Sequence, residues 1–136
     1  IFAGMRTGED LAAHYASADL FLFPSLTETF GNVTAEALAS GLAVVAYDYA
    51  AARQLVRDGE NGLLAPFDDG AAFVAAAARL AGDAALLRAL QARAPASVDA
   101  MDWDRIVQHL VATFERVIRR HGRNDDAQAV AAIAPD

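Results

Sequence analysis

The stretch "DLFLFPSLTETFGNVTAEALASGLAVVAYD", residues 19–48, holds the pattern that decides the fold. It opens with a short continuous apolar run closed by Pro24, which is typical of a strand buried on both faces. Helix-forming residues follow from Thr34 to Ser40, and Gly41 stands where a helix C-terminus favours glycine. A second apolar run, residues 42–48, predicts another buried strand. Strand, helix and strand in this order indicate parallel pairing in an α/β fold.

The same alternation of strands and helices continues on both sides of this stretch. We therefore expect residues 1–121 to form one partial domain with a Rossmann-like parallel sheet and flanking helices, and residues 122–136 to form a loose tail. In chain order, the other predicted elements are a strand at 1–4, helices at 9–18 and 51–57, a turn at 58–62, a strand at 63–67, and helices at 71–82, 83–94 and 103–121.

Composition excludes several classes of protein. The 136 residues are 55% hydrophobic, yet no apolar run approaches the roughly 18–20 residues of a membrane span. The net charge of −7 argues against a nucleic-acid partner, which would need a basic face. The absence of Cys removes disulfides and thiolate metal sites and fits a reducing, cytoplasmic compartment. The chain starts without Met or a signal peptide, so we expect a piece of a longer protein.

The segment between the two apolar runs of residues 19–48 contains the candidate ligand-binding residues. Ligands of parallel sheets bind at the carboxyl ends of strands, and the first turn of a helix offers free backbone N–H groups to an anion. Gly31 allows a close backbone approach there, and Asn32 or Thr29 is expected to cap the helix. Glu36 and Glu28 flank this anion site on either side and suit vicinal hydroxyls. The pattern therefore predicts a nucleoside diphosphate that carries a sugar.

Residues 19–48 resemble the signature of nucleotide-sugar glycosyltransferases of the GT-B fold, family 4 or "group 1". The shared pattern is a strand ending in Pro-Ser, a Glu, Phe-Gly, Glu-Ala-x-Ala-x-Gly and a Val-Val strand, with Glu28 and Glu36 as a paired-glutamate motif. Further matches are "VRDGENGLLAPFDD", residues 56–69, and Trp103, so the resemblance covers about residues 1–120. The chain departs from the family at residues 50–55, "AAARQL", where relatives often have a Gly-Gly turn followed by Glu.

The resemblance implies a role for each residue of the motif. Glu28 is the catalytic candidate and contacts donor-sugar hydroxyls, whereas Glu36 contacts the ribose. Met5 and Arg6 fall where the family places the nucleotide base. No metal and no cofactor is expected. The remaining donor-binding residues are Thr29, Phe30, Gly31, Asn32 and Val33.

The resemblance also implies a function for the longer protein. It is a retaining transferase that moves a hexosyl group from GDP-mannose or a UDP-hexose to a glycan or lipid acceptor, in the bacterial cytoplasm or at the periphery of the inner membrane. The chain would be the later part of the C-terminal, donor-binding domain, without the N-terminal acceptor domain and the first strands of its own domain. Alone it is expected to be inactive and to self-associate through an unpaired strand edge. A sugar-nucleotide epimerase and a non-catalytic scaffold are the alternatives.

Several other residues have a simpler structural interpretation beside a functional one. Asp102 and Asp104 imitate a metal-binding Asp-x-Asp, but Asp102 is expected as the N-cap of the following helix and Asp104 in its first turn. Trp103 is expected in the core or as a helix anchor, and Arg53 as a solvated charge or a phosphate contact. The arginines of residues 116–123 suit a helix C-terminus or an anionic membrane. His14, His109 and His121 show no partner spacing.

Overall fold

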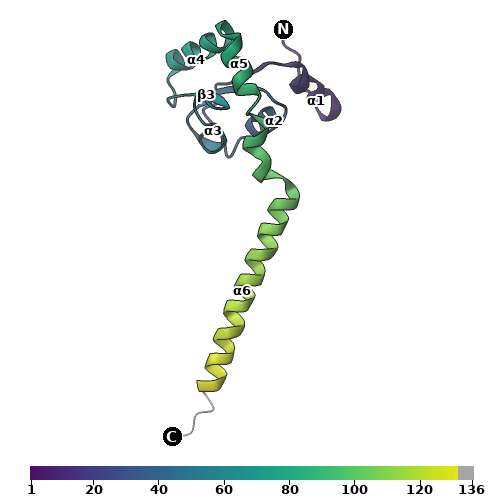
Figure 1. Cartoon of the computed structure of the whole chain (residues 1–136), viewed down its shortest axis with the longest axis vertical. Helices are drawn as coiled ribbons and strands as arrows, with labels where there is room; N and C mark the ends of the chain where they lie inside the picture. Colours follow the sequence, from purple (N-terminus) through teal and green to yellow (C-terminus); the bar gives the residue numbers. More distant parts are fainter. Residues whose placement is uncertain (132–136) are drawn as a thin grey trace. The chain divides into compact units, whose positions relative to one another are not determined.

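The computed structural model describes residues 1–131, with side chains as far as residue 121. The chain divides into two units, Ile1–Asp99 and Ala100–Asp136, and each is described by itself. The first unit alternates helices and strands as the sequence predicts (Figure 1). Its elements are α1 (Gly8–Ser17), β1 (Leu20–Phe23), α2 (Asn32–Ala39), β2 (Ala43–Tyr47), α3 (Ala50–Leu55), β3 (Gly62–Ala65), α4 (Gly70–Gly82) and α5 (Ala84–Gln91), followed by the 3-10 helix η1 (Pro95–Met101) across the division.

The three strands form one parallel sheet in the order β1-β2-β3. Phe21 pairs with Val44 across the first ladder, and Val44 pairs with Gly62 across the second. Every residue of the central strand β2 is buried, as its continuous apolar run predicts. The predicted fold class is confirmed, because the described chain forms a parallel sheet with flanking helices.

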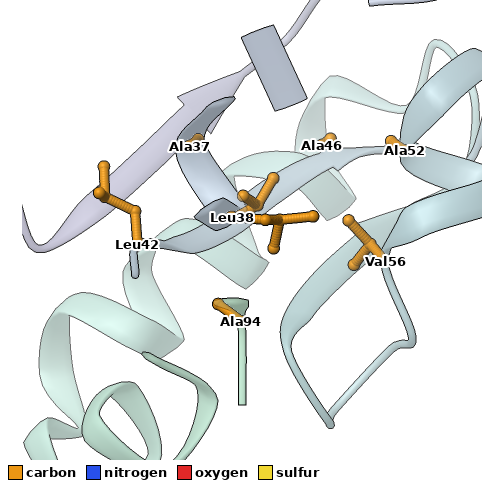
Figure 2. Close-up of a cluster of buried hydrophobic side chains, with 8 residues drawn as sticks. Ala37, Leu38, Leu42, Ala46, Ala52, Val56 and Ala94 are labelled. Carbon is orange, nitrogen blue, oxygen red and sulfur yellow. The ribbon is translucent and has the colours of Figure 1, made fainter. Parts of the chain in front are cut away.

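Alternate residues of β2 enter two separate hydrophobic clusters, since successive side chains of a strand point to opposite faces. Val44 and Ala46 join what we call the α2–α3 cluster, shown in Figure 2, with Ala37, Leu38, Leu42, Ala52, Val56 and Ala94. The other face carries Ala43, Val45 and Tyr47, packed with Leu63, Ala65, Phe73, Leu80 and Leu90 from β3, α4 and α5. The sheet is therefore covered on both faces at β2.

The edge strand β1 is less buried than the sequence predicts. Leu22 is 47% exposed and the other three residues are partly buried, so the prediction of burial on both faces was wrong. Within the described residues β1 pairs only with β2, which leaves its second edge without a partner strand. The predicted strand at residues 1–4 is also absent, and Ile1 and Phe2 are fully exposed. A strand needs a neighbouring strand to satisfy its backbone, and this segment has none.

Helix α2 ends as the sequence predicts. The N–H of Gly41 donates to the carbonyl of Leu38 at 3.0 Å, and the N–H of Leu42 donates to the carbonyl of Ala37 at 3.1 Å. These two bonds form a Schellman motif, which satisfies the last carbonyls of the helix. The chain thereby turns directly from α2 into β2.

The second unit is the helix α6 (Trp103–Ala131). Asp102 caps it as predicted, because its Oδ1 accepts from the N–H of Asp104 at 2.9 Å. Trp103 is 77% exposed, so the prediction of a core position was wrong. The helix continues through Gly122, where the sequence predicts a loose tail, because one glycine costs a helix only about 1 kcal/mol. Residues 132–136 of that predicted tail lie outside the described residues.

The arginines of residues 116–123 therefore do not lie at a helix C-terminus, and Arg119 pairs instead with Glu115 at 3.5 Å. The apolar stripe of α6 is exposed along its described side chains, namely Ile106, Val107, Leu110, Val111, Phe114, Val117 and Ile118. No single helix of the described part has the length and apolar character to cross a membrane. One bent pair, Gly70–Gly82 with Ala84–His121, meets that test by length and composition alone.

Candidate functional site

The candidate site lies at the carboxyl ends of β1 and β2. Because these strands are parallel, the loop of residues 24–31 after β1 and the turn after β2 meet at one edge of the sheet. They enclose a cavity of about 10 Å³, roughly the space that one water needs. Its lining includes Ser25, Glu28, Phe30, Thr34, Tyr49 and Ala51.

Tyr49 fixes the backbone of this loop at Glu28. Its hydroxyl donates to the carbonyl oxygen of Glu28 at 2.7 Å and accepts from the N–H of the same residue. The ring of Tyr49 packs against Phe67, with 5.0 Å between the ring centroids. Sequence reasoning missed Tyr49, although a tyrosine directly after a buried strand, at its carboxyl end, is a signal that could have found it.

The carboxylate of Glu28 is held on one side and open on the other. Its Oε1 accepts from the Oγ of Ser25 at 2.8 Å. Its Oε2 accepts no hydrogen bond from the described part of the chain. A Cβ built on Gly31 would lie 3.6 Å from that oxygen and 3.5 Å from the Cβ of Ala51. These are ordinary van der Waals distances, but Gly31 has a φ of +98°, which side chains rarely adopt, so glycine is required here for its conformation.

Helix α2 starts at Asn32, directly after this glycine and two residues earlier than predicted. Gly31 is the N-cap and no side chain caps the helix, so the predicted capping by Asn32 or Thr29 was wrong. The carbonyl of Gly31 accepts from the N–H of Thr34 at 3.0 Å, whereas Asn32 and Val33 have N–H groups without an intrahelical partner. The loop itself is tied to α3, since the N–H of Ala51 donates to the Phe30 carbonyl at 2.7 Å. Free N–H groups thus lie next to Glu28 in the chain.

Glu36, further along α2, contacts a different element. The hydroxyl of Tyr15 on α1 donates to its Oε2 at 3.2 Å. Burial raises the pKa of Tyr15 from 10.0 to about 12, and the charge and hydrogen bond of Glu36 add to this shift. Tyr15 was not among the predicted site residues, because its contact joins helices 21 positions apart in the sequence.

Alkaline pH is expected to destabilise the protein through Tyr15. Folding raises the pKa of Tyr15 from 10.0 to about 12, so its stabilisation is complete below pH 10.0 and is lost as the pH rises towards 12. The chain has no Lys and no Cys, so neither of these side-chain types contributes to the pH dependence in this interval. Thermal melts across the interval should show a shallower fall of Tm in Tyr15→Phe than in the wild type. Parallel falls would contradict the prediction.

The other predicted residues are not brought together with Glu28. Met5 is 93% exposed, and Arg6 pairs with Asp10 of its own segment at 3.1 Å. Thr29 is exposed on the loop. Arg53 binds Asp48 through Nε–Oδ1 at 3.0 Å, which accounts for this guanidinium without a phosphate. The described residues contain no group of three or more His, Cys, Asp or Glu suited to a metal.

Ala50, the first residue of α3, has a φ of +48°, in the left-handed region. This conformation costs a residue with a Cβ about 1–2 kcal/mol, more than the added chain entropy of glycine. Ala50→Gly is therefore expected to raise the free energy of unfolding by about 0.5–1 kcal/mol in urea denaturation. The control Ala52→Gly, in the same helix, should lower it by about 1 kcal/mol. A loss in both variants would show that Ala50 is unstrained.

The model of the family described as "Glycosyl transferases group 1" matches residues 1–83. The chain belongs to this family. One relative, D-inositol 3-phosphate glycosyltransferase from Salinispora tropica, is 35% identical over 120 residues, which are 88% of this chain and 25% of that protein. The GDP-mannose-dependent alpha-mannosyltransferase of Mycobacterium tuberculosis is 47% identical over 66 residues, 48% of this chain and 18% of that protein.

A solved structure agrees with the family assignment. Sucrose-phosphate synthase from Thermosynechococcus elongatus superposes with a TM-score of 0.77 and 30% identity, over 88% of this chain and 30% of that one. This group 1 chain therefore spans about a third or less of each of these three proteins.

Proposed function

We propose that the chain is the donor-binding part of a retaining glycosyltransferase, which transfers a hexosyl group from a nucleoside diphosphate sugar to a glycan or lipid acceptor. The observation that carries the proposal is the arrangement at Gly31. There a carboxylate with one open oxygen, Glu28, adjoins the free N–H groups that begin α2 at the carboxyl edge of a parallel sheet. Membership of the group 1 family supports it.

In this proposal each part of the site meets one part of the donor. The diphosphate lies at the N–H groups of Gly31, Asn32 and Val33, where the helix dipole favours negative charge. The open Oε2 of Glu28 accepts from hydroxyls of the donor sugar, and Glu36 accepts from the ribose. The scheme needs no metal, because helix N–H groups stabilise the charge that develops on the leaving diphosphate.

The proposal also names the donor to test first and the place of the acceptor domain. GDP-mannose is the first donor to test, because a relative with 47% identity is described as dependent on it, and a UDP-hexose is the second. The acceptor domain lies in a longer protein, and this chain alone is inactive. The second edge of β1 is the place where the isolated chain would self-associate.

Calorimetry on the full-length protein tests the nucleotide site. One of GDP and UDP is expected to bind, and Glu36→Ala should weaken that binding by about 1–3 kcal/mol, the usual effect of an unpaired polar partner. Glu60→Ala removes the same charge from the turn before β3, where it lies near Arg57, and should bind like the wild type. Absence of binding by folded protein would favour the scaffold alternative. Product formation without any acceptor would favour an epimerase.

A further inference from the structure

Glu36 owes its position to a helix other than its own. Its side chain is exposed on α2, and in the described part of the chain its hydrogen-bond partner is Tyr15 of α1, at 3.2 Å from Oε2. A glutamate has three rotatable bonds, so an exposed one keeps its rotamer freedom unless a partner selects one rotamer. The phenol of Tyr15 supplies that partner.

Tyr15 is itself oriented by aromatic contacts. Its ring lies 5.9 Å from that of Phe21 on β1, at 55°, and Phe21 stacks on Phe23 at 5.6 Å. No residue of α1 is buried, and Tyr15 is the residue of α1 that packs against the α2–α3 cluster. The sheet thus orients the ring, and the ring orients the hydroxyl.

The hydrogen bond from Tyr15 leaves the other oxygen of the Glu36 carboxylate, Oε1, available. A carboxylate has two oxygens and about four acceptor positions, and Tyr15 uses one position on Oε2. The pKa of Tyr15, raised to about 12, keeps its hydroxyl protonated at neutral pH, so it donates. The Oε1 of Glu36 accepts no hydrogen bond from the described residues and can take a ligand hydroxyl.

We infer that Tyr15 is a positioning residue for the nucleotide: its hydroxyl holds Glu36 so that Oε1 faces the vicinal hydroxyls of the ribose. This inference rests on the proposed function. It links α1 to the binding site, because loss of the Tyr15 contact releases Glu36, and ribose binding to Glu36 in turn favours the docked helix. Ordering Glu36 in advance lowers the entropy lost on binding.

The test is calorimetry on the full-length protein with GDP, UDP and their 2′,3′-dideoxy analogues. Tyr15→Phe keeps the ring and is expected to weaken binding of the preferred ribonucleotide about 3- to 10-fold, the effect of one hydrogen bond. It should leave the dideoxy analogue unchanged. In a Glu36→Ala background Tyr15→Phe should have no further effect, since the two residues act together. His14→Ala is the control, because the ring of His14 interacts with Asp10 of its own helix.

The outcomes separate this inference from the proposed function. If the wild type prefers the ribonucleotide and Tyr15→Phe binds it equally well, the inference fails and the proposed function stands. Equal losses for ribo- and dideoxynucleotide would make Tyr15 a structural residue and also overturn the inference. If the wild type binds no nucleotide, or binds both forms alike, the ribose role of Glu36 fails and the inference fails with it.

Discussion

Replacing Gly62 by alanine is expected to lower the free energy of unfolding by about 3 kcal/mol. A Cβ at this position would lie 2.5 Å from the carbonyl oxygen of Val44 and 2.9 Å from the Cγ1 of Val56. Val44 is part of the central strand, so its backbone cannot move without disturbing both ladders. Overpacking in a core usually costs 1–3 kcal/mol, and contact with a fixed carbonyl belongs at the upper end.

A second glycine provides the control for this prediction. Gly82 ends α4, and a Cβ added there would have no atom within 4 Å, so Gly82→Ala should raise the free energy of unfolding by about 0.5–1 kcal/mol. Urea denaturation followed by circular dichroism measures both variants. The urea midpoint should fall in Gly62→Ala and rise in Gly82→Ala. A midpoint of Gly62→Ala within error of the wild type would mean that β3 does not approach β2 as closely as described.

The elements predicted correctly are those whose signal is local. The apolar run of residues 42–48 is long and uninterrupted, and β2 is buried throughout. The division between the helices predicted at residues 71–82 and 83–94 is also present, and there the Oδ1 of Asp83 accepts from the N–H groups of Ala85 and Leu86. Such features depend on a few neighbouring residues, so the sequence alone predicts them.

The errors concern features that depend on distant partners. Residues 1–4 have the composition of a strand, but pairing requires another strand and the described chain offers none to them. The exposure of Leu22 likewise follows from the place of β1 at the edge of the sheet, which composition does not encode. Strand order is a property of the whole sheet, and a single run of residues carries no signal for it.

The residues of the candidate site also separate into those with a local sequence signal and those that depend on distant partners. Glu28, Gly31 and Glu36 were predicted because they belong to one continuous motif between two strands. Tyr49 and Tyr15 were missed because each reaches the motif from another element, 21 positions away in both cases. Sequence therefore indicated the groups proposed to meet the ligand, whereas the groups that hold them in place became visible only in three dimensions.

Removing the Glu28 side chain is expected to reduce kcat/KM of the full-length enzyme about 100-fold. Each hydrogen bond between a sugar hydroxyl and a carboxylate contributes about 1.5–3 kcal/mol, and 1.36 kcal/mol corresponds to a tenfold change in rate. Glu28→Ala should leave the fold intact, because Tyr49 binds the backbone of residue 28 and not its side chain. The loss should therefore appear in transfer activity while Tm changes little.

Two matched variants make the Glu28 result interpretable. Ser25→Ala removes the donor to Oε1 but keeps the carboxylate, so kcat/KM should fall only about 3- to 10-fold. Glu60→Ala removes an exposed carboxylate from the turn before β3 and should leave the rate unchanged. Initial rates at varied donor concentration, with acceptor in excess, give the comparison. If Glu28→Ala lost no more activity than Ser25→Ala, the carboxylate would not contact the donor sugar, and the free N–H groups of α2 would have to position the donor without it.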